Sequence, residues 1–112
     1  MSRKQEIYAK MLSLSVPYIR NVQTHSAITK GFNKSCYQEA ELVHNLYVSI
    51  LEPEFTLHDI HFLNHQARYY YEKAEVTKTP CFHTQCRLIA ELFLLVPDDM
   101  KSSLEWSGPQ IL

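Results

Sequence analysis

Glycine is scarce in this sequence, with two residues among 112. Strands joined by tight hairpins usually need more residues that can take a positive φ angle, which glycine does at the least steric cost. The scarcity therefore disfavours a fold built from β-hairpins and favours helices. A long hydrophobic run is also lacking, because the longest one, residues 88–97, is interrupted by Glu91 and is too short to cross a bilayer.

Signals for export are lacking as well. The N-terminus has no apolar stretch behind a basic start, so we expect neither a secretory signal nor a transit peptide and, by default, a cytoplasmic protein. The chain has three cysteines (Cys36, Cys81 and Cys86) without the spacing of a disulfide framework, which indicates reduced thiols. Cys81 and Cys86 should point to different sides of a helix, because five positions correspond to a rotation of roughly 140°.

The composition that is present fits one globular domain. Apolar residues make up 46% of the chain and charged residues 21%, which are ordinary values for a folded protein. A length of 112 residues suffices to bury one hydrophobic core and not two. We therefore expect residues 1–112 to form a single domain.

Four long segments carry apolar residues at helical spacing, and Pro97 with Asp98 and Asp99 indicates the start of one more short helix. Pro17 should kink the first predicted helix or split it, and residues 24–34 lack the pattern and are predicted to form a loop. The fourth helix is apolar nearly all round and should be the most buried. The predicted helices cover residues 3–23, 35–51 and 56–75, a fourth that starts at 80 and a short fifth that starts at 97. The apolar stripe predicted for the second comprises Cys36, Ala40, Val43, Tyr47, Ile50 and Leu51.

Capping residues mark three of the predicted helix starts. A hydroxyl or carboxylate at such a position accepts a hydrogen bond from a backbone N–H that the helix leaves unpaired. Helices joined by short connections pack most economically as a bundle, so the sequence predicts an all-α, single-domain bundle of four main helices plus a short C-terminal helix. The capping positions are Ser35 with Gln38, Thr56 with Asp59, and Thr79 before Pro80.

Three histidines lie opposite the predicted core stripe of the third helix. In the stretch TLHDIHFLNHQARYYYEK, residues 56–73, the spacing of His58, His61 and His65 places them on one side of a helix. Phe62 and Tyr69 flank them. The apolar stripe on the other side comprises Ile60, Leu63, Ala67, Tyr70, Tyr71 and Ala74.

Neither a metal site nor catalysis is indicated by these histidines. His61 and His65 could present two ring nitrogens to one ion, but zinc usually needs a third and a fourth protein ligand. His58 lies seven positions from His65, about 10 Å along the axis, which is too far to share that ion comfortably. No nucleophile motif or phosphate-binding loop occurs elsewhere. We therefore predict no cofactor, no metal and no catalytic residue.

Charge is segregated along the chain. Residues 1–34 hold six lysines and arginines and one glutamate, a net charge of +5, whereas residues 35–67 hold five acidic residues and no lysine or arginine, a net charge of −5. The acidic span contains four of the six histidines. An acidic surface repels nucleic-acid phosphates, so the natural partner is a basic protein.

Two explanations remain open for the aromatic residues beside the histidines. Aromatic rings with polar edges are typical of the centre of a protein interface. Alternatively, the C-terminal tail with Leu104 and Trp106 covers Phe62 and Tyr69.

The stretch LVPDDMKSSLEWSGPQ, residues 95–110, resembles the closing segment of small all-helical immunity proteins that are encoded beside bacterial toxins, including those of contact-dependent inhibition systems. The resemblance implies a cognate inhibitor that binds a toxin domain, often a basic nuclease, and covers its active site.

The sequence thus predicts a non-catalytic, protein-binding domain, most specifically an immunity protein. One alternative is a small helical regulator in which the same face pairs with a second copy as a homodimer, and another is a histidine-based metal-binding protein. We expect no membrane and no direct nucleic-acid contact. The predicted partner-binding residues are Glu52, Glu54, His58, Asp59, His61, Phe62, His65 and Tyr69.

Overall fold

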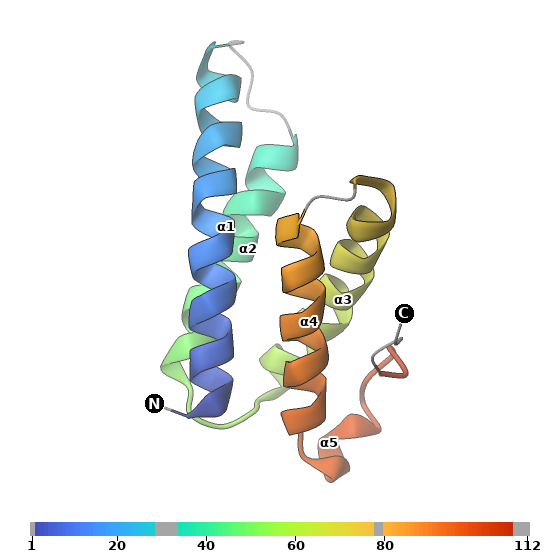
Figure 1. The fold of residues 1–112 in the computed structure, drawn as a ribbon. Coiled ribbons are helices and arrows are strands. Elements are labelled where there is room, and N and C mark those ends of the chain that lie inside the picture. The colour runs from blue at the N-terminus through green and yellow to red at the C-terminus, as the bar shows by residue number, and fades with distance from the viewer. Residues whose placement is uncertain (1, 29–33, 78–79, 109–112) are drawn as a thin grey trace.

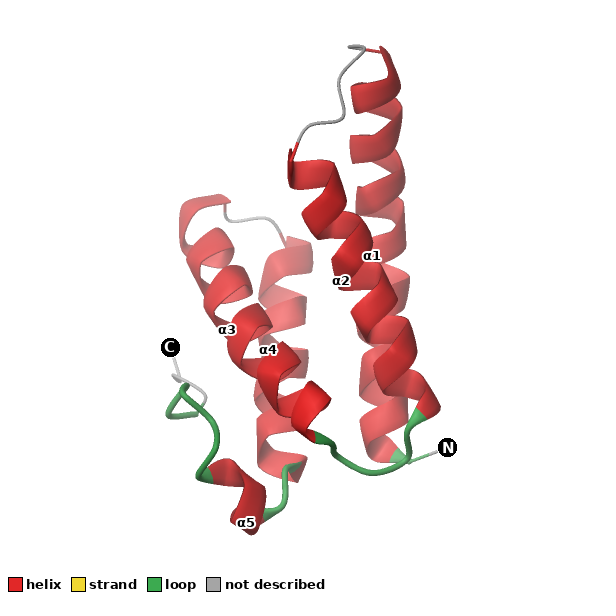
Figure 2. Cartoon of the chain, turned by 180° about the vertical axis from the view of Figure 1, so that it is seen from behind, coloured by secondary structure: helices red, strands yellow, loops and turns green. Residues whose placement is uncertain are grey.

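The computed structural model describes the backbone of residues 2–28, 34–77 and 80–108, and the side chains of residues 2–15, 41–76 and 80–108. Within these ranges the chain consists of four main helices and a short fifth one, without a strand (Figure 1 and Figure 2). The predicted all-α fold class is confirmed. The helices are α1 (Arg3–Ile28), α2 (Lys34–Leu51), α3 (Leu57–Thr77), α4 (Pro80–Leu95) and α5 (Asp98–Lys101).

The main helices form two hairpins that lie side by side, α1 with α2 and α3 with α4 (Figure 1). α1 also packs against α4, whereas the contact between α2 and α3 is slight. The bundle is therefore a ring of four helices that is loosely closed on one side, between α2 and α3. None of the described helices has the length and apolar character needed to cross a membrane.

The predicted end of the first helix was wrong, and of the two predictions for Pro17, a kink or a split, the split was wrong. α1 is not split at Pro17 and continues to Ile28, five residues beyond the predicted end at 23. A proline removes one backbone donor, but the turns on either side keep their own hydrogen bonds, and each further residue extends an existing helix at little cost. The rest of the predicted loop that falls within residues 29–33 lies outside the described residues.

The other helix starts agree more closely with the sequence. α2 begins at Lys34, one residue before the predicted start, and α4 begins at Pro80 as predicted. α3 extends to Thr77, two residues past its predicted end at 75. The side chains of Ser35 and Gln38, and all of Thr79, lie outside the described part of the chain.

Apolar side chains from all four main helices fill the core. The stripe predicted for α3 is confirmed except for Tyr71, which is half-buried. The stripe predicted for α2 was wrong at Tyr47 and Leu51, which are 58% and 64% exposed, because Leu42 and Leu46 face the core instead. In the last turn of α4, Leu94 and Leu95 are 66% and 40% exposed, so this helix is not buried all round. The buried apolar residues are Ile7, Tyr8, Met11, Leu42, Leu46, Ile60, Phe62, Leu63, Ala67, Tyr70, Ala74, Phe82, Cys86, Leu88, Ile89, Leu92 and Val96.

The segment after α5 turns back along α3 and α4. The Oδ1 atom of Asn64 accepts hydrogen bonds from the backbone N–H groups of Glu105, at 3.0 Å, and Trp106, at 3.3 Å. The Trp106 ring lies 5.6 Å from the Tyr71 ring and 5.1 Å from the Phe93 ring, measured between centroids. The tail thus packs on the Asn64 side of α3, while Phe62 on the other side packs against Tyr8, with 5.8 Å between ring centroids.

Gly108 has a φ angle of +114°, a conformation that L-residues rarely adopt. A Cβ atom there would lie 3.0 Å from Cε1 of Phe93. Gly108→Ala should therefore lower the free energy of unfolding by about 1–3 kcal/mol. Urea unfolding measures this loss, with the exposed neighbour Ser107→Ala as the control. Equal stability of the two variants would contradict the assigned backbone conformation.

Candidate protein-binding surface

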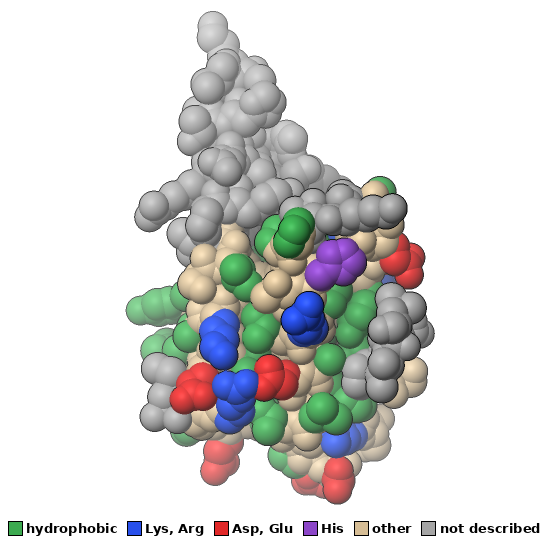
Figure 3. All heavy atoms as spheres, viewed as in Figure 1, with side chains coloured by type: hydrophobic (Ala, Val, Ile, Leu, Met, Phe, Trp, Pro, Cys, Tyr) green, Lys and Arg blue, Asp and Glu red, His purple; other side chains and the backbone are tan. Residues whose placement is uncertain are grey.

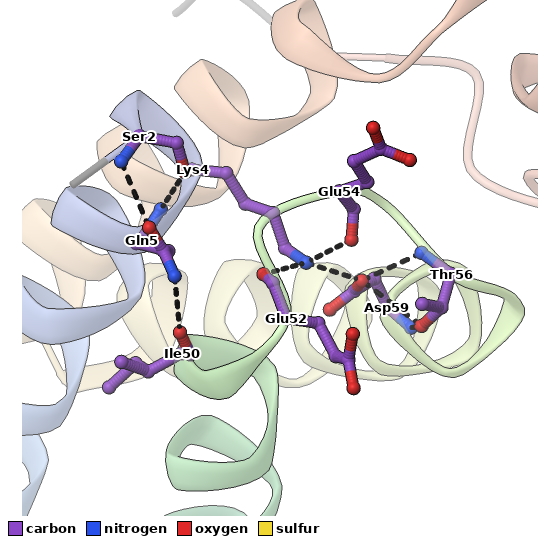
Figure 4. A network of polar contacts seen from close by, with 8 residues as sticks. All are labelled: Ser2, Lys4, Gln5, Ile50, Glu52, Glu54, Thr56 and Asp59. Carbon is purple, nitrogen blue, oxygen red and sulfur yellow. Dashed lines mark hydrogen bonds and ion pairs between the residues drawn. The ribbon is translucent and has the colours of Figure 1, made fainter.

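The ammonium group of Lys4 on α1 binds the inner side of the connection between α2 and α3 (Figure 4). Its Nζ atom donates hydrogen bonds to the carbonyl oxygens of Glu52, at 2.9 Å, and Glu54, at 2.6 Å, and to Oδ2 of Asp59, at 2.8 Å. Three acceptors thus match the three hydrogens of an ammonium group. The side chains of Lys4 and Asp59 are 3% and 1% exposed, so the ion pair is buried.

Asp59 also caps α3, as the sequence predicts. Its Oδ2 atom accepts hydrogen bonds from the backbone N–H of Thr56, at 2.8 Å, and from the Thr56 hydroxyl, at 3.1 Å. In return, the Asp59 N–H donates to Oγ1 of Thr56, at 3.3 Å. One carboxylate oxygen therefore joins the cap of α3 to the first turn of α1.

A second contact from the first turn of α1 fixes the end of α2. Nε2 of Gln5 donates to the carbonyl oxygen of Ile50, at 2.9 Å, and Oε1 of the same side chain accepts from the backbone N–H of Ser2, at 2.9 Å (Figure 4). The last turn of α2, the connection and the first turn of α3 are thus all tied to α1.

Because the backbone carbonyls of the connection turn inward, several of its side chains are left at the surface. We call the exposed residues of this region the α2–α3 corner: Leu51, Glu52, Pro53, Glu54, Leu57 and His58. Leu51 and Leu57 are 64% and 66% exposed, although both are apolar. The corner therefore combines two carboxylates with two exposed leucines on a fixed backbone. Sequence reasoning missed the leucines, because it assigned Leu51 to the core stripe of α2.

The structure places Glu52, Glu54 and all three histidines of α3 at the surface, as predicted. Tyr69 is half-buried, and its ring packs edge-on against Tyr70 at 5.1 Å between centroids.

Asp59 and Phe62, which we predicted to belong to the same surface, are buried. Asp59 points into the bundle because Lys4 of α1 reaches it there, and Phe62 is covered by Tyr8 of α1. The buried arc of α3 is thus wider than its apolar stripe alone, since α1 packs against its Phe62 edge. These two predictions of an exposed binding residue were wrong.

A groove of about 350 Å³ lies between α2 and α3, where the two helices make little contact. His61 and His65 form part of its rim, so two of the three histidines face a concave surface. Phe62 and Gln66 belong to its floor, because both are buried. The lining residues are Glu41, Leu42 and Asn45 of α2 and His61, Phe62, His65 and Gln66 of α3.

On the opposite side of the bundle, formed by α1 and α4, the described side chains carry charges of both signs. Figure 3 shows acidic and basic side chains intermixed on this face. Arg3 pairs with Glu6 at 3.3 Å and also with Glu91 of α4. The basic residues described at the start of α1 are thus partly neutralised by acids or, like Lys4, buried.

Within the described part of the chain, no three His, Cys, Asp or Glu side chains lie close enough together to hold a metal ion. Cys81 and Cys86 are free thiols, and burial raises the pKa of Cys86 to about 11, which keeps it protonated at neutral pH. Cys36 lies outside the residues whose side chains are described.

Comparisons with protein-family models, with curated proteins and with solved structures find no match for this chain. Its function therefore has to be inferred from the corner and the groove themselves.

Replacing Lys4 with methionine leaves the buried carboxylate of Asp59 without its counter-charge and should lower the free energy of unfolding by about 3–5 kcal/mol. Asp59→Asn leaves the ammonium group unpaired and should cost a comparable amount. The double variant should lose clearly less free energy of unfolding than the sum of the two single variants, because neither charge is then buried without its partner. Urea unfolding followed by circular dichroism measures all three.

The matched control for these variants is Lys10→Met, which removes an exposed lysine from the same helix. It should change the free energy of unfolding by less than about 0.5 kcal/mol. A Lys4→Met variant as stable as Lys10→Met would show that the ion pair does not hold the corner.

Tyr8 lies next to the ion pair, with its ring centroid 5.8 Å from Nζ of Lys4. Burial first, and then the negative charge of Asp59, raise the pKa of Tyr8 well above its ordinary value of 10.0. Its phenol therefore stays protonated in the folded chain at a pH at which an unfolded tyrosine ionises.

The free energy of unfolding should consequently fall as the pH rises above about 10, because the folded state then binds more protons than the unfolded state. Tyr8→Phe should reduce this fall, whereas replacement of the exposed Tyr47 by phenylalanine should leave it unchanged. Urea unfolding between about pH 8 and 10.5 tests the difference. Identical pH profiles for the two variants would argue against a protonated Tyr8.

Proposed function

We propose that this chain is a protein-binding domain and, in its most specific form, an immunity protein that binds and neutralises a cognate bacterial toxin. The observation that carries the proposal is the α2–α3 corner. Its backbone is fixed by Lys4, while Glu52 and Glu54 extend into solvent between two exposed leucines. A surface held in one conformation before binding loses less conformational entropy when a partner docks.

The charge of this region indicates a basic partner. Residues 35–67, which include the corner and every residue that lines the groove, hold five acids and no lysine or arginine. Complementary charge steers two proteins together and disfavours partners of the wrong sign. The exposed leucines would supply the apolar contact area that charge alone does not give.

The toxin version of this proposal is supported by the resemblance of residues 95–110 to the closing segment of immunity proteins. A nuclease toxin binds phosphates through basic side chains, and an acidic corner would compete for the same side chains. Binding would then cover the toxin's active site without any catalysis by this chain.

Glu52→Gln combined with Glu54→Gln should weaken binding to a basic toxin domain at least about tenfold, mainly through slower association. The partner to be tested is the purified product of the reading frame next to the gene. The matched control, Asp98→Asn with Asp99→Asn, removes the same charge from exposed positions on α5 and should bind nearly as well as the native chain. Surface plasmon resonance gives both rate constants.

Growth of cells that co-express the neighbouring product provides the functional test. If that product is harmless or does not bind, the toxin version is wrong. If light scattering instead shows a stable dimer of this chain that Glu52→Gln with Glu54→Gln alters, the homodimeric regulator is the better explanation.

A further inference from the structure

Hydrogen-bond acceptors from both helices surround the groove between α2 and α3. The α2 wall contributes the carboxylate of Glu41 and the amide of Asn45, and the α3 wall contributes the amide of Gln66. His61 and His65 add imidazoles, each of which has an acceptor nitrogen when neutral. No lysine or arginine is found among the described residues that line the groove. The groove is therefore suited to a cationic donor.

Five described side chains have a buried polar atom without a hydrogen-bond partner, and Gln66 is the one of them that lines the groove. Its side chain is 5% exposed, and its Oε1 atom is buried without a hydrogen-bond partner among the described residues. Buried acceptors are almost always paired, because losing water without gaining a donor is unfavourable. A leucine at this position would have no acceptor to remove from water. A donor that enters the groove beside Gln66 would pair this oxygen once the side-chain amide turns toward it.

The shape of the groove favours a guanidinium group over an ammonium group. A guanidinium is planar and weakly hydrated and carries five N–H donors, so it can bond several acceptors while its face lies against apolar side chains. Leu42 and Phe62 provide that apolar surface. An ammonium is compact and strongly hydrated, and a groove of about 350 Å³ is much larger than it needs.

We propose that this groove binds an arginine side chain of the partner protein, with Glu41 pairing its charge and Gln66 accepting one of its N–H groups. This inference rests on the proposed function and names the side chain that the acidic surface recognises. The corner then supplies steering and apolar contact, and the groove supplies a specific anchor. Arginine is among the residues enriched at the energetic centres of interfaces.

The test uses two blocked peptides of equal charge, acetyl-Ala-Arg-Ala-amide and acetyl-Ala-Lys-Ala-amide, titrated into the full chain labelled with nitrogen-15. The side-chain amide signals of Asn45 and Gln66 should shift saturably with the arginine peptide. Binding should be at least about threefold tighter than for the lysine peptide, because one ammonium cannot reach all the acceptors. Absence of these shifts, or equal affinities for the two peptides, overturns the proposal.

Three variants locate the interaction. Glu41→Gln, at an exposed position, should weaken arginine binding at least about tenfold by removing a charge-assisted hydrogen bond. Glu75→Gln removes an exposed charge from α3 outside the groove and is the matched control. Equal effects of these two substitutions would mean that only the overall charge matters, which also overturns the proposal.

Gln66→Leu separates a binding role from a structural one. If Gln66 serves a ligand, the leucine variant should melt at a higher temperature than the native chain and should lose its preference for arginine over lysine. A lower melting temperature would show that the fold itself needs this amide and would overturn the argument from its unpaired oxygen.

Failure of this inference can be distinguished from failure of the proposed function. If the toxin domain binds through Glu52 and Glu54 but the arginine peptide leaves the groove signals unchanged, only the arginine site is wrong. If the arginine peptide binds at the groove but the neighbouring gene product does not bind this chain, only the toxin partner is wrong.

Discussion

The buried ion pair between Lys4 and Asp59 is the interaction on which the arrangement of this molecule depends. It joins the first turn of α1, the connection that follows α2 and the first turn of α3. Burying two charges is costly, and an apolar pair of similar volume can be equally stable, so the energetic gain is not its main effect. Its effect is geometric, because the ammonium group that pairs with Asp59 also binds the carbonyls of Glu52 and Glu54 and so restrains the connection.

Local patterns in the sequence predicted the features that depend on local structure, namely the helices, a helix cap and a buried stripe. Helical spacing identified the four main helices, and Pro97 with the two aspartates after it indicated the short fifth one. The pairing of Thr56 with Asp59 predicted the cap of α3, and the apolar stripe of α3 is buried as expected except for Tyr71. The ion pair between Lys4 and Asp59 was not predicted, because a role in capping α3 already accounted for Asp59. The position of Lys4 in the sequence nevertheless indicates a buried ion pair. Lys4 precedes Ile7, Tyr8 and Met11 at helical spacing, which places it on the buried side of α1, where a charge needs a partner of opposite sign.

The errors concern contacts that depend on how distant helices cross. The side of α3 that bears Phe62 is buried because α1 reaches it, and no spacing within α3 encodes that crossing. For α2, Tyr47 and Leu51 extend the helical pattern as well as Leu42 and Leu46 do, and tertiary packing selects the second pair. The histidine positions were predicted correctly because they lie farthest from the core, where moderate shifts of the buried arc do not change their exposure.

The corner and the groove follow from the same packing. α2 and α3 are tied to each other through α1 at their junction but make little direct contact along their lengths, so the bundle is loosely closed on this side. Near this junction, the described residues of both helices belong to the span 35–67, which contains no lysine or arginine. Segregation of charge along the sequence thereby becomes segregation in space, since consecutive helices are neighbours across the groove. A tightly closed bundle would have covered Glu41 and Asn45, whereas this one leaves their acceptors beside an open groove whose described lining includes no lysine or arginine.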